Sequence, residues 1–244
     1  MADTKLPELI VALDMEEKDL ALAMVGELGE VVNFYKVGSR LFTACGPDIV
    51  REIKRAGNRV FLDLKFHDIP ATVAGSVRAA VRIGVDMLTI HTSGGLDMMK
   101  MAVEASSEEA EKLALKKPML LGVTVLTSLT SGELLQMFDY TGKVEELVLN
   151  LADMAKDAGL DGVVSSVWEA EAIRKAVGEG FVIVTPGIRP QDSAIGDQKR
   201  VATPRDALLA GADYIVVGRP ITKSTSPRDE AVAILEELEK GALE

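Results

Sequence analysis

Asp63-Leu64-Lys65-Phe66-His67-Asp68-Ile69-Pro70-Ala71-Thr72 closes an apolar run and places two opposite charges two residues apart. Side chains of a strand alternate between its two faces, so Asp63 and Lys65 are predicted to share one face while Leu62 and Leu64 occupy the other. Burying two charges is costly unless they are paired and hydrogen-bonded. A core strand that ends in this way therefore indicates a functional site, and Pro70 suits the start of the helix that follows.

Around this stretch, short apolar runs alternate with longer helical patterns, as is typical of βαβ units with a parallel sheet. Eight such runs favour a closed (β/α)8 TIM barrel of the α/β class over an open sheet. The expected strands are Leu9–Leu13, Asn33–Val37, Val60–Leu64, Met87–Ile90, Met119–Leu126, Gly162–Ser165, Phe181–Thr185 and Tyr214–Val217.

The strand and helix rhythm runs nearly from end to end, and no Ser- or Pro-rich linker interrupts it. We therefore predict one domain over residues 1–244. Glycines at 57, 84, 159 and 211 precede expected strands and suit left-handed helix ends. The longest segment without periodicity runs from Gly187 to Arg200. It is predicted to be a lid or binding loop, the alternative being a mobile surface loop.

Composition limits the classes of partner. The net charge of −11 argues against binding to nucleic acid or to an anionic membrane, because both need a basic surface. A single cysteine, Cys45, excludes an internal disulfide, and with only two histidines no Cys/His metal site is expected. No signal peptide precedes the first strand, and no apolar run approaches the roughly 18 residues of a membrane span. We expect a soluble, cytoplasmic protein.

Catalytic residues of such barrels lie at the C-terminal ends of the strands, and here those ends are polar. Taken singly, each charge could be a capping or surface ion pair, above all Asp14 and Lys36. Taken together, their alternating signs favour one hydrogen-bonded array, in which Lys65 is a charged proton donor and Asp63 faces the substrate. His67 and His91 are more often positioning or packing residues. The residues of the predicted array are Asp14, Lys36, Asp63, Lys65 and Asp68.

A second cluster indicates an anion site. Gly218 and Arg219 follow the eighth strand, where a glycine allows close backbone approach and an arginine recognises oxyanions. Loops after the seventh and eighth strands form the recurring phosphate site of this architecture. Arg189, Gln198, Lys199 and Arg200 lie in the preceding loop, although a solvated surface role remains open for Lys199 and Arg200.

These motifs resemble orotidine 5′-phosphate decarboxylase of the bacterial and archaeal type. The resemblance covers nearly the whole chain. Sister barrels acting on sugar phosphates share Asp-x-Lys-x-x-Asp, whereas Ile-Pro-x-Thr and Gly-Ile-Arg-Pro are typical of the decarboxylase. The matching stretches are Val11–Asp14, Lys36–Gly38, Asp63–Thr72, Thr185–Arg189 and Val217–Pro220.

The resemblance implies cofactor-free conversion of orotidine 5′-phosphate to uridine 5′-phosphate and carbon dioxide in pyrimidine synthesis, by a homodimer with shared active sites. Lys65 would protonate C6 of the pyrimidine and Asp63 would face the departing carboxylate. The resemblance also implies ribose binding by Lys36 and Asp14, contact with the partner's site by Asp68 and Thr72, and substrate binding by Ile69. Base and loop contacts are implied for Thr127 or Ser128, Pro186 and Arg189, and phosphate binding for Gln198, Gly218 and Arg219.

Three other readings stay open at this point. One is a metal-dependent sister barrel acting on sugar phosphates, and a second makes Lys65 a Schiff-base nucleophile. The third is a metabolite-binding barrel without activity, because a fold alone does not imply catalysis.

Overall fold

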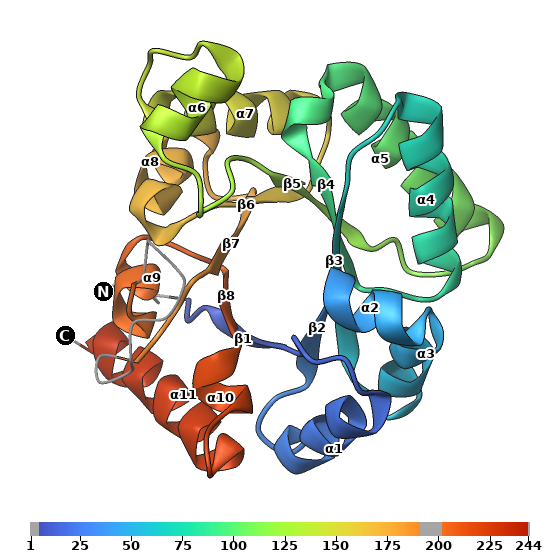
Figure 1. Cartoon of the computed structure of the whole chain (residues 1–244), viewed down its shortest axis with the longest axis vertical. Helices are drawn as coiled ribbons and strands as arrows, with labels where there is room; N and C mark the ends of the chain where they lie inside the picture. The colour runs from blue at the N-terminus through green and yellow to red at the C-terminus, as the bar shows by residue number, and fades with distance from the viewer. Residues whose placement is uncertain (1–4, 191–201, 244) are drawn as a thin grey trace.

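Eight parallel strands pair in chain order and close on themselves, β8 beside β1, in a computed structural model that describes residues 5–190 and 202–243. This confirms the predicted barrel, which Figure 1 shows nearly end-on. The strands are β1 (Glu8–Ala12), β2 (Phe34–Gly38), β3 (Arg59–Phe66), β4 (Met87–His91), β5 (Met119–Val123), β6 (Gly162–Val164), β7 (Val182–Pro186) and β8 (Tyr214–Val217).

Helices surround the strands on the outside of the ring (Figure 1). None of those in the described ranges is long and apolar enough to cross a membrane. They are α1 (Lys18–Leu28), α2 (Ser39–Cys45), α3 (Asp48–Arg55), α4 (Pro70–Arg82), the 3-10 turn η1 (Thr92–Gly94), α5 (Leu96–Lys112), α6 (Ser131–Phe138), α7 (Val144–Asp157), α8 (Val167–Val177), α9 (Pro204–Leu209), α10 (Arg219–Thr222) and α11 (Pro227–Leu243).

Two strands differ most from the sequence expectation. β5 ends at Val123 rather than Leu126, because its last pair is with Val164, where the short β6 also ends. β3 runs two residues longer than expected, to Phe66, and its pairing with β4 is irregular. The α4 helix begins at Pro70, as predicted.

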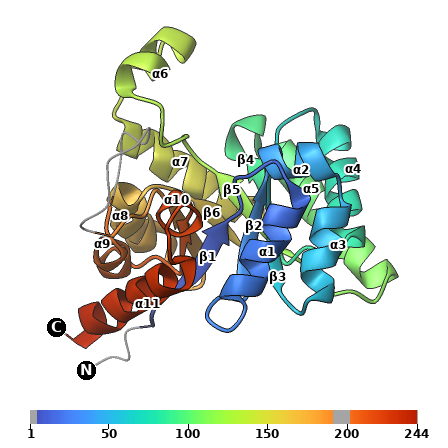
Figure 2. The same ribbon diagram turned by 60° about the horizontal axis from the view of Figure 1, so that its bottom comes forward.

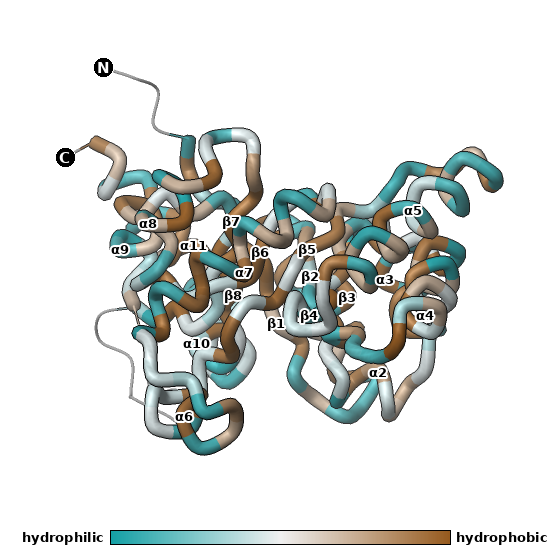
Figure 3. Tube along the Cα trace, turned by 90° about the horizontal axis from the view of Figure 1, so that it is seen from above, coloured by the Kyte–Doolittle hydropathy of each residue, from teal (hydrophilic) through white to brown (hydrophobic). Residues whose placement is uncertain are grey.

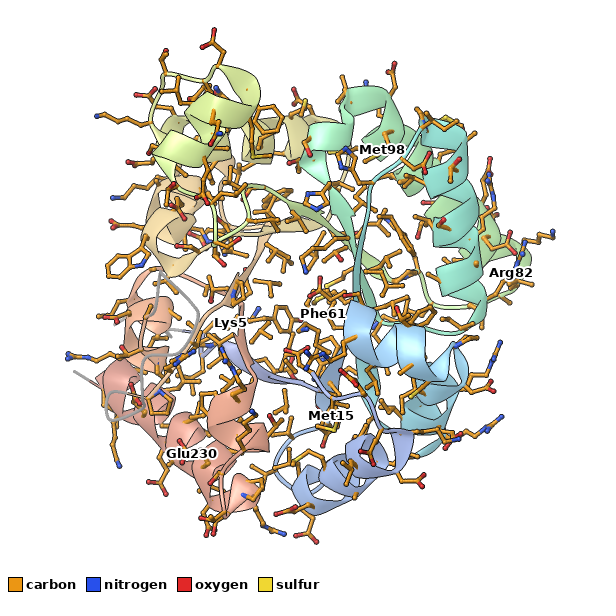
Figure 4. The ribbon with its side chains drawn as sticks, in the orientation of Figure 1. Lys5, Met15, Phe61, Arg82, Met98 and Glu230 are labelled. Atoms are coloured by element: carbon orange, nitrogen blue, oxygen red, sulfur yellow. The ribbon has the colours of Figure 1, made fainter. Side chains whose placement is uncertain are left out.

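Alternation along the strands produces two apolar layers. Phe61 and its equivalents on other strands fill the barrel interior, whereas Leu62 packs between strands and helices. Figure 4 shows Phe61 near the centre of the ring, and the tube in Figure 3 is brown along the strands and more hydrophilic on the outer helices. Burial of apolar surface on both faces of the sheet stabilises the barrel, at about 25 cal/mol per Å².

At the N-terminal end of the barrel, one arrangement recurs three times. A helix ends in Gly-x-Asp, the glycine has a positive φ (Gly84 80°, Gly159 82°, Gly211 77°), and the aspartate precedes the next strand. The backbone N–H of the aspartate donates a hydrogen bond to the carbonyl of one residue on the preceding strand, and the aspartate carboxylate accepts a hydrogen bond from the N–H of that same residue. The side chain thus extends the hydrogen-bond ladder between the two strands by one pair. We call these the clasps; they join Asp86 to Val60, Asp161 to Leu120 and Asp213 to Ile183.

Candidate active site

A cavity of about 630 Å³ opens at the C-terminal end of the barrel. Helix α6 projects beyond the body of the barrel in Figure 2, after the segment that leaves β5. The cavity combines charged and polar groups with apolar walls. Its lining includes these predicted site residues: Asp14, Lys36, Asp63, Lys65, Thr127, Pro186, Arg189, Gly218 and Arg219.

Four of these side chains form a continuous charge array. Lys36 Nζ lies 3.1 Å from Asp14 Oδ1 and 3.4 Å from Asp63 Oδ2. Asp63 Oδ1 accepts a hydrogen bond from Lys65 Nζ at 2.8 Å. Asp63 therefore lies between two lysines that come from neighbouring strands, as the sequence predicted. The prediction was wrong for Asp68, which is exposed beyond the end of β3 and forms no ion pair with these residues.

Local backbone geometry brings Lys65 into this array. Lys65 has a φ of 52°, the left-handed region that residues with side chains rarely adopt. It lies in a bulge, because Leu62 pairs with Leu88 and Phe66 with Ile90, so three residues of β3 face one residue of β4. Bulges redirect side chains and are frequent near active sites. The bulge thus keeps both Asp63 and Lys65 on the inner face.

Glycine at position 38 leaves room for the array. A Cβ added there would lie 3.1 Å from Lys36 Nζ and 3.3 Å from Asp14 Oδ1, tighter than most real contacts. An alanine would therefore press on the ion pair that joins the two residues. This is a local reason for Lys36-Val37-Gly38 at the end of β2.

The charges set one another's protonation. Burial by itself would raise the pKa of Asp63, but attraction to Lys36 and Lys65 and hydrogen bonds from Lys65 and Thr89 outweigh it and lower that pKa. Burial would lower the pKa of Lys36, and Asp63 and Asp14 together raise it instead. Asp63 and Lys36 therefore stabilise each other's ionised forms.

Three residues predicted to form an anion site, Arg189, Gly218 and Arg219, also line the cavity. Arg189 is buried at 6% exposure, and Arg219 follows β8 at the exposed rim. Arg40 and Lys223 line the same cavity, although sequence reasoning did not single them out. Arg40 lies in α2 and Lys223 caps the end of α10. Single cations in such positions give little signal in one sequence, since most belong to solvated surfaces. Gln198, Lys199 and Arg200 lie outside the described residues.

Other predicted residues are not in the cavity wall. Asp68, Ile69 and Thr72 are exposed beyond the end of β3, with Ile69 at 67% exposure, and none of them lines the cavity. Of the two alternatives after β5, Thr127 lines it and Ser128 does not.

The two histidines lie together beside the array. The rings of His67 and His91 are 5.2 Å apart. Burial, followed by His67 and Lys65, lowers the pKa of His91. Within 5–190 and 202–243, no three His, Cys, Asp or Glu residues gather in a way that could hold a metal ion.

Comparison with known proteins gives one consistent result. The family model described as "Orotidine 5'-phosphate decarboxylase / HUMPS family" matches residues 7–234. A protein of Syntrophomonas wolfei named orotidine 5′-phosphate decarboxylase is 50% identical, over 95% of this chain and 98% of the relative. One of Moorella thermoacetica with the same name is also 50% identical, over 95% and 92%. The crystal structure of orotidine 5′-phosphate decarboxylase from Lactobacillus acidophilus superimposes with a TM-score of 0.84 at 36% identity, covering 95% of this chain and 99% of that one.

Proposed function

We propose that this chain, which belongs to the orotidine 5′-phosphate decarboxylase / HUMPS family, converts orotidine 5′-phosphate to uridine 5′-phosphate and carbon dioxide in pyrimidine biosynthesis, without a cofactor. The observation that carries the proposal is the Lys36–Asp63–Lys65 array at the open end of the barrel. The names of relatives at 50% identity supply the substrate class.

Lys65 is the proposed proton donor. Breaking the bond between C6 and the carboxylate leaves an electron pair on C6, with no adjacent carbonyl to accept it. A fixed ammonium stabilises that developing charge and then delivers its proton, so C6–H replaces C6–CO2. The Lys65 side chain is 34% exposed and lines the cavity, which leaves it accessible to a substrate while Asp63 fixes its position.

Asp63 is proposed to face the substrate carboxylate. Because its pKa is lowered, it stays ionised beside the bound carboxylate, and their repulsion is relieved as neutral carbon dioxide departs. Lys36 and Asp14 are proposed to bind ribose hydroxyls, since their polar ends meet at the cavity wall.

The phosphate is assigned to Gly218 and Arg219, with Gln198 from the preceding loop. Thr127, Pro186 and Arg189 are proposed to border the base, all three being in the cavity wall. The phosphate binds far from C6, so its binding energy can favour a closed, desolvated site and raise the rate of the chemical step.

We further propose a homodimer that shares its active sites. Asp68, Ile69 and Thr72 follow directly from the strand that carries Lys65, yet they are exposed and do not line this chain's own cavity. A partner subunit would explain both the exposed Ile69 and the position of Asp68.

Turnover of orotidine 5′-phosphate, followed by its pyrimidine absorbance, tests the activity. We expect full turnover in excess chelator. A chelator-sensitive reaction would support a metal-dependent sister activity, and a folded but inactive protein would support the binding-only reading. Borohydride with a carbonyl substrate should leave no adduct on Lys65.

Subunit mixing tests the shared site. Lys65→Ala and Asp68→Ala chains are each expected to be nearly inactive. Unfolding and refolding them together should restore activity through hybrid dimers in which one site has both intact residues. Activity no greater than the sum of the two separate variants would place Asp68 and Lys65 in the same chain's site.

A further inference from the structure

Thr89 is a buried polar residue in the middle of β4 to which the mechanism above gives no part. Its neighbours Met87, Leu88 and Ile90 are apolar, and all four residues are 0% exposed. Alternation places Thr89 on the inner face of the barrel with Met87, but it does not line the cavity. It therefore makes no direct contact with a ligand held there.

The Thr89 hydroxyl joins the two central residues of the array. It accepts a hydrogen bond from the backbone N–H of Lys65 at 2.9 Å and donates one to Asp63 Oδ1 at 3.0 Å. A hydroxyl has one proton to give and lone pairs to accept with, so both bonds can form at once. One side chain thus holds the backbone of the proposed acid and the carboxylate of its partner.

The hydrogen bond from the backbone N–H of Lys65 to Thr89 compensates for a backbone partner that the bulge removes. Three residues of β3, Asp63 to Lys65, lie opposite the single residue Thr89, so the regular ladder cannot supply a partner for each of their N–H groups. Buried N–H groups without partners are rare and costly. Thr89 Oγ1 takes the place of a ladder carbonyl, at the residue whose φ of 52° is itself strained.

The carboxylate bond fixes the rotation of Asp63. Oδ1 accepts from both Thr89 and Lys65, and this leaves Oδ2 facing Lys36 at 3.4 Å. A hydrogen bond to the ionised form also favours that form over the neutral acid. The same hydroxyl thus influences where Asp63 points and when it is protonated.

We propose that Thr89 is a positioning residue that holds the bulge and the Asp63 carboxylate in the arrangement from which Lys65 donates its proton. The inference rests on the proposed function, because it assumes that Lys65 and Asp63 act on the substrate. A methyl in place of the hydroxyl keeps the size of the side chain but removes both bonds.

The test compares Thr89→Val with Thr89→Ser and with Thr92→Val. Thr92 is equally buried, but its hydroxyl donates to the backbone carbonyl of Val123 instead of to a carboxylate of the array. We expect Thr89→Val to lower kcat by about 10- to 100-fold, the loss of a hydrogen bond to a charged group, with KM nearly unchanged. Thr89→Ser should recover most of kcat, and Thr92→Val should stay near the wild type.

The pH profile separates positioning from a general loss of structure. Without the hydroxyl the pKa of Asp63 rises, so the acidic limb of log kcat should move to higher pH in Thr89→Val and return in Thr89→Ser. If Thr89→Val does not fold, Thr89→Cys, which replaces the hydroxyl with a weaker donor, should show the same direction of change.

Two results would overturn the inference. The first is a kcat and acidic limb in Thr89→Val that match the wild type, and the second is an equal change in Thr92→Val. Both presuppose an active wild-type chain. A wild type without turnover of orotidine 5′-phosphate would instead refute the proposed function.

Discussion

The two ends of the barrel each hold a lysine–aspartate pair of nearly equal geometry. At the N-terminal end, Lys54 Nζ lies 2.6 Å from Asp86, and at the C-terminal end Lys65 Nζ lies 2.8 Å from Asp63. The lysine side chains are also similarly exposed, at 30% and 34%. Neither distance nor exposure distinguishes the two pairs.

Their remaining partners differ. Asp86 accepts the backbone N–H of Val60 at 2.8 Å, so its carboxylate closes a strand ladder. Asp63 is held by side chains: two lysines and the Thr89 hydroxyl. A carboxylate bonded to backbone contributes to the fold, whereas one held among movable charges can respond to a bound anion. The partners of each aspartate beyond its paired lysine, more than the ion pair itself, therefore indicate whether the aspartate serves the fold or the cavity.

Replacing the lysine at the catalytic end should have the largest effect. Lys65→Ala is expected to lower turnover by about 10⁴-fold or more, because it removes both the proposed proton donor and a fixed positive charge. Binding of uridine 5′-phosphate, measured by calorimetry, should remain detectable. Turnover within about 100-fold of the wild type would assign proton transfer elsewhere.

At the opposite end, the clasp of Asp213 should affect stability instead. Asp213 accepts from Arg174, whose side chain is 13% exposed, and from the N–H of Ile183. Asp213→Ala leaves both without this acceptor and should cost about 3 kcal/mol, lowering Tm by roughly 6–12 °C. Asp213→Asn should cost less. Thermal and urea unfolding measure this, while kcat of the folded protein should not change.

The charge array should make the free energy of unfolding depend on pH through Asp63. The pKa of Asp63 is lowered by folding, so its contribution is present above its unfolded value of about 3.9 and is lost as pH falls through the lower folded value. The difference in unfolding free energy between wild type and Asp63→Asn should therefore shrink below about pH 4. Urea titrations across that range test it, and a constant difference would contradict it.

The smallest effect is expected from the lysine of the matched pair. Lys54→Ala removes a partly exposed ion pair, but Asp86 keeps its bond to Val60, so the loss should be about 1 kcal/mol or less. Turnover should equal that of the wild type. A loss of activity comparable to that of Lys65→Ala would mean that the two ends are coupled.

Much of this arrangement could be predicted from the sequence. The alternation of short apolar runs with helical patterns predicted the eight strands, and period-two alternation predicted the shared face of Asp63 and Lys65. The glycines at 57, 84, 159 and 211 do have positive φ. The bulge could not be predicted, because it depends on the register between β3 and β4. Thr89 gave one signal that could have been used, a polar residue at an inward position of an apolar strand.

Two further features could not be predicted from one sequence for physical reasons. The Gly-x-Asp repeat was visible as helix ends, but the use of its aspartates depends on which strand lies alongside. The roles proposed for Asp68, Ile69 and Thr72 would require a second chain, which one sequence does not describe, and the one-domain interpretation of residues 1–244 stays a prediction.

The clasps also suggest an order of assembly. Each joins residues close in sequence, 26, 41 and 30 positions apart, and each links a strand to the next strand along the chain. Contacts of short sequence separation form at lower entropic cost than distant ones. The seam instead pairs β1 with β8, and just before these two strands Lys5 contacts Asp213, 208 positions away. We expect these three strand pairs to acquire amide protection first and the ring to close last, so that the cavity exists only once the first and last strands meet.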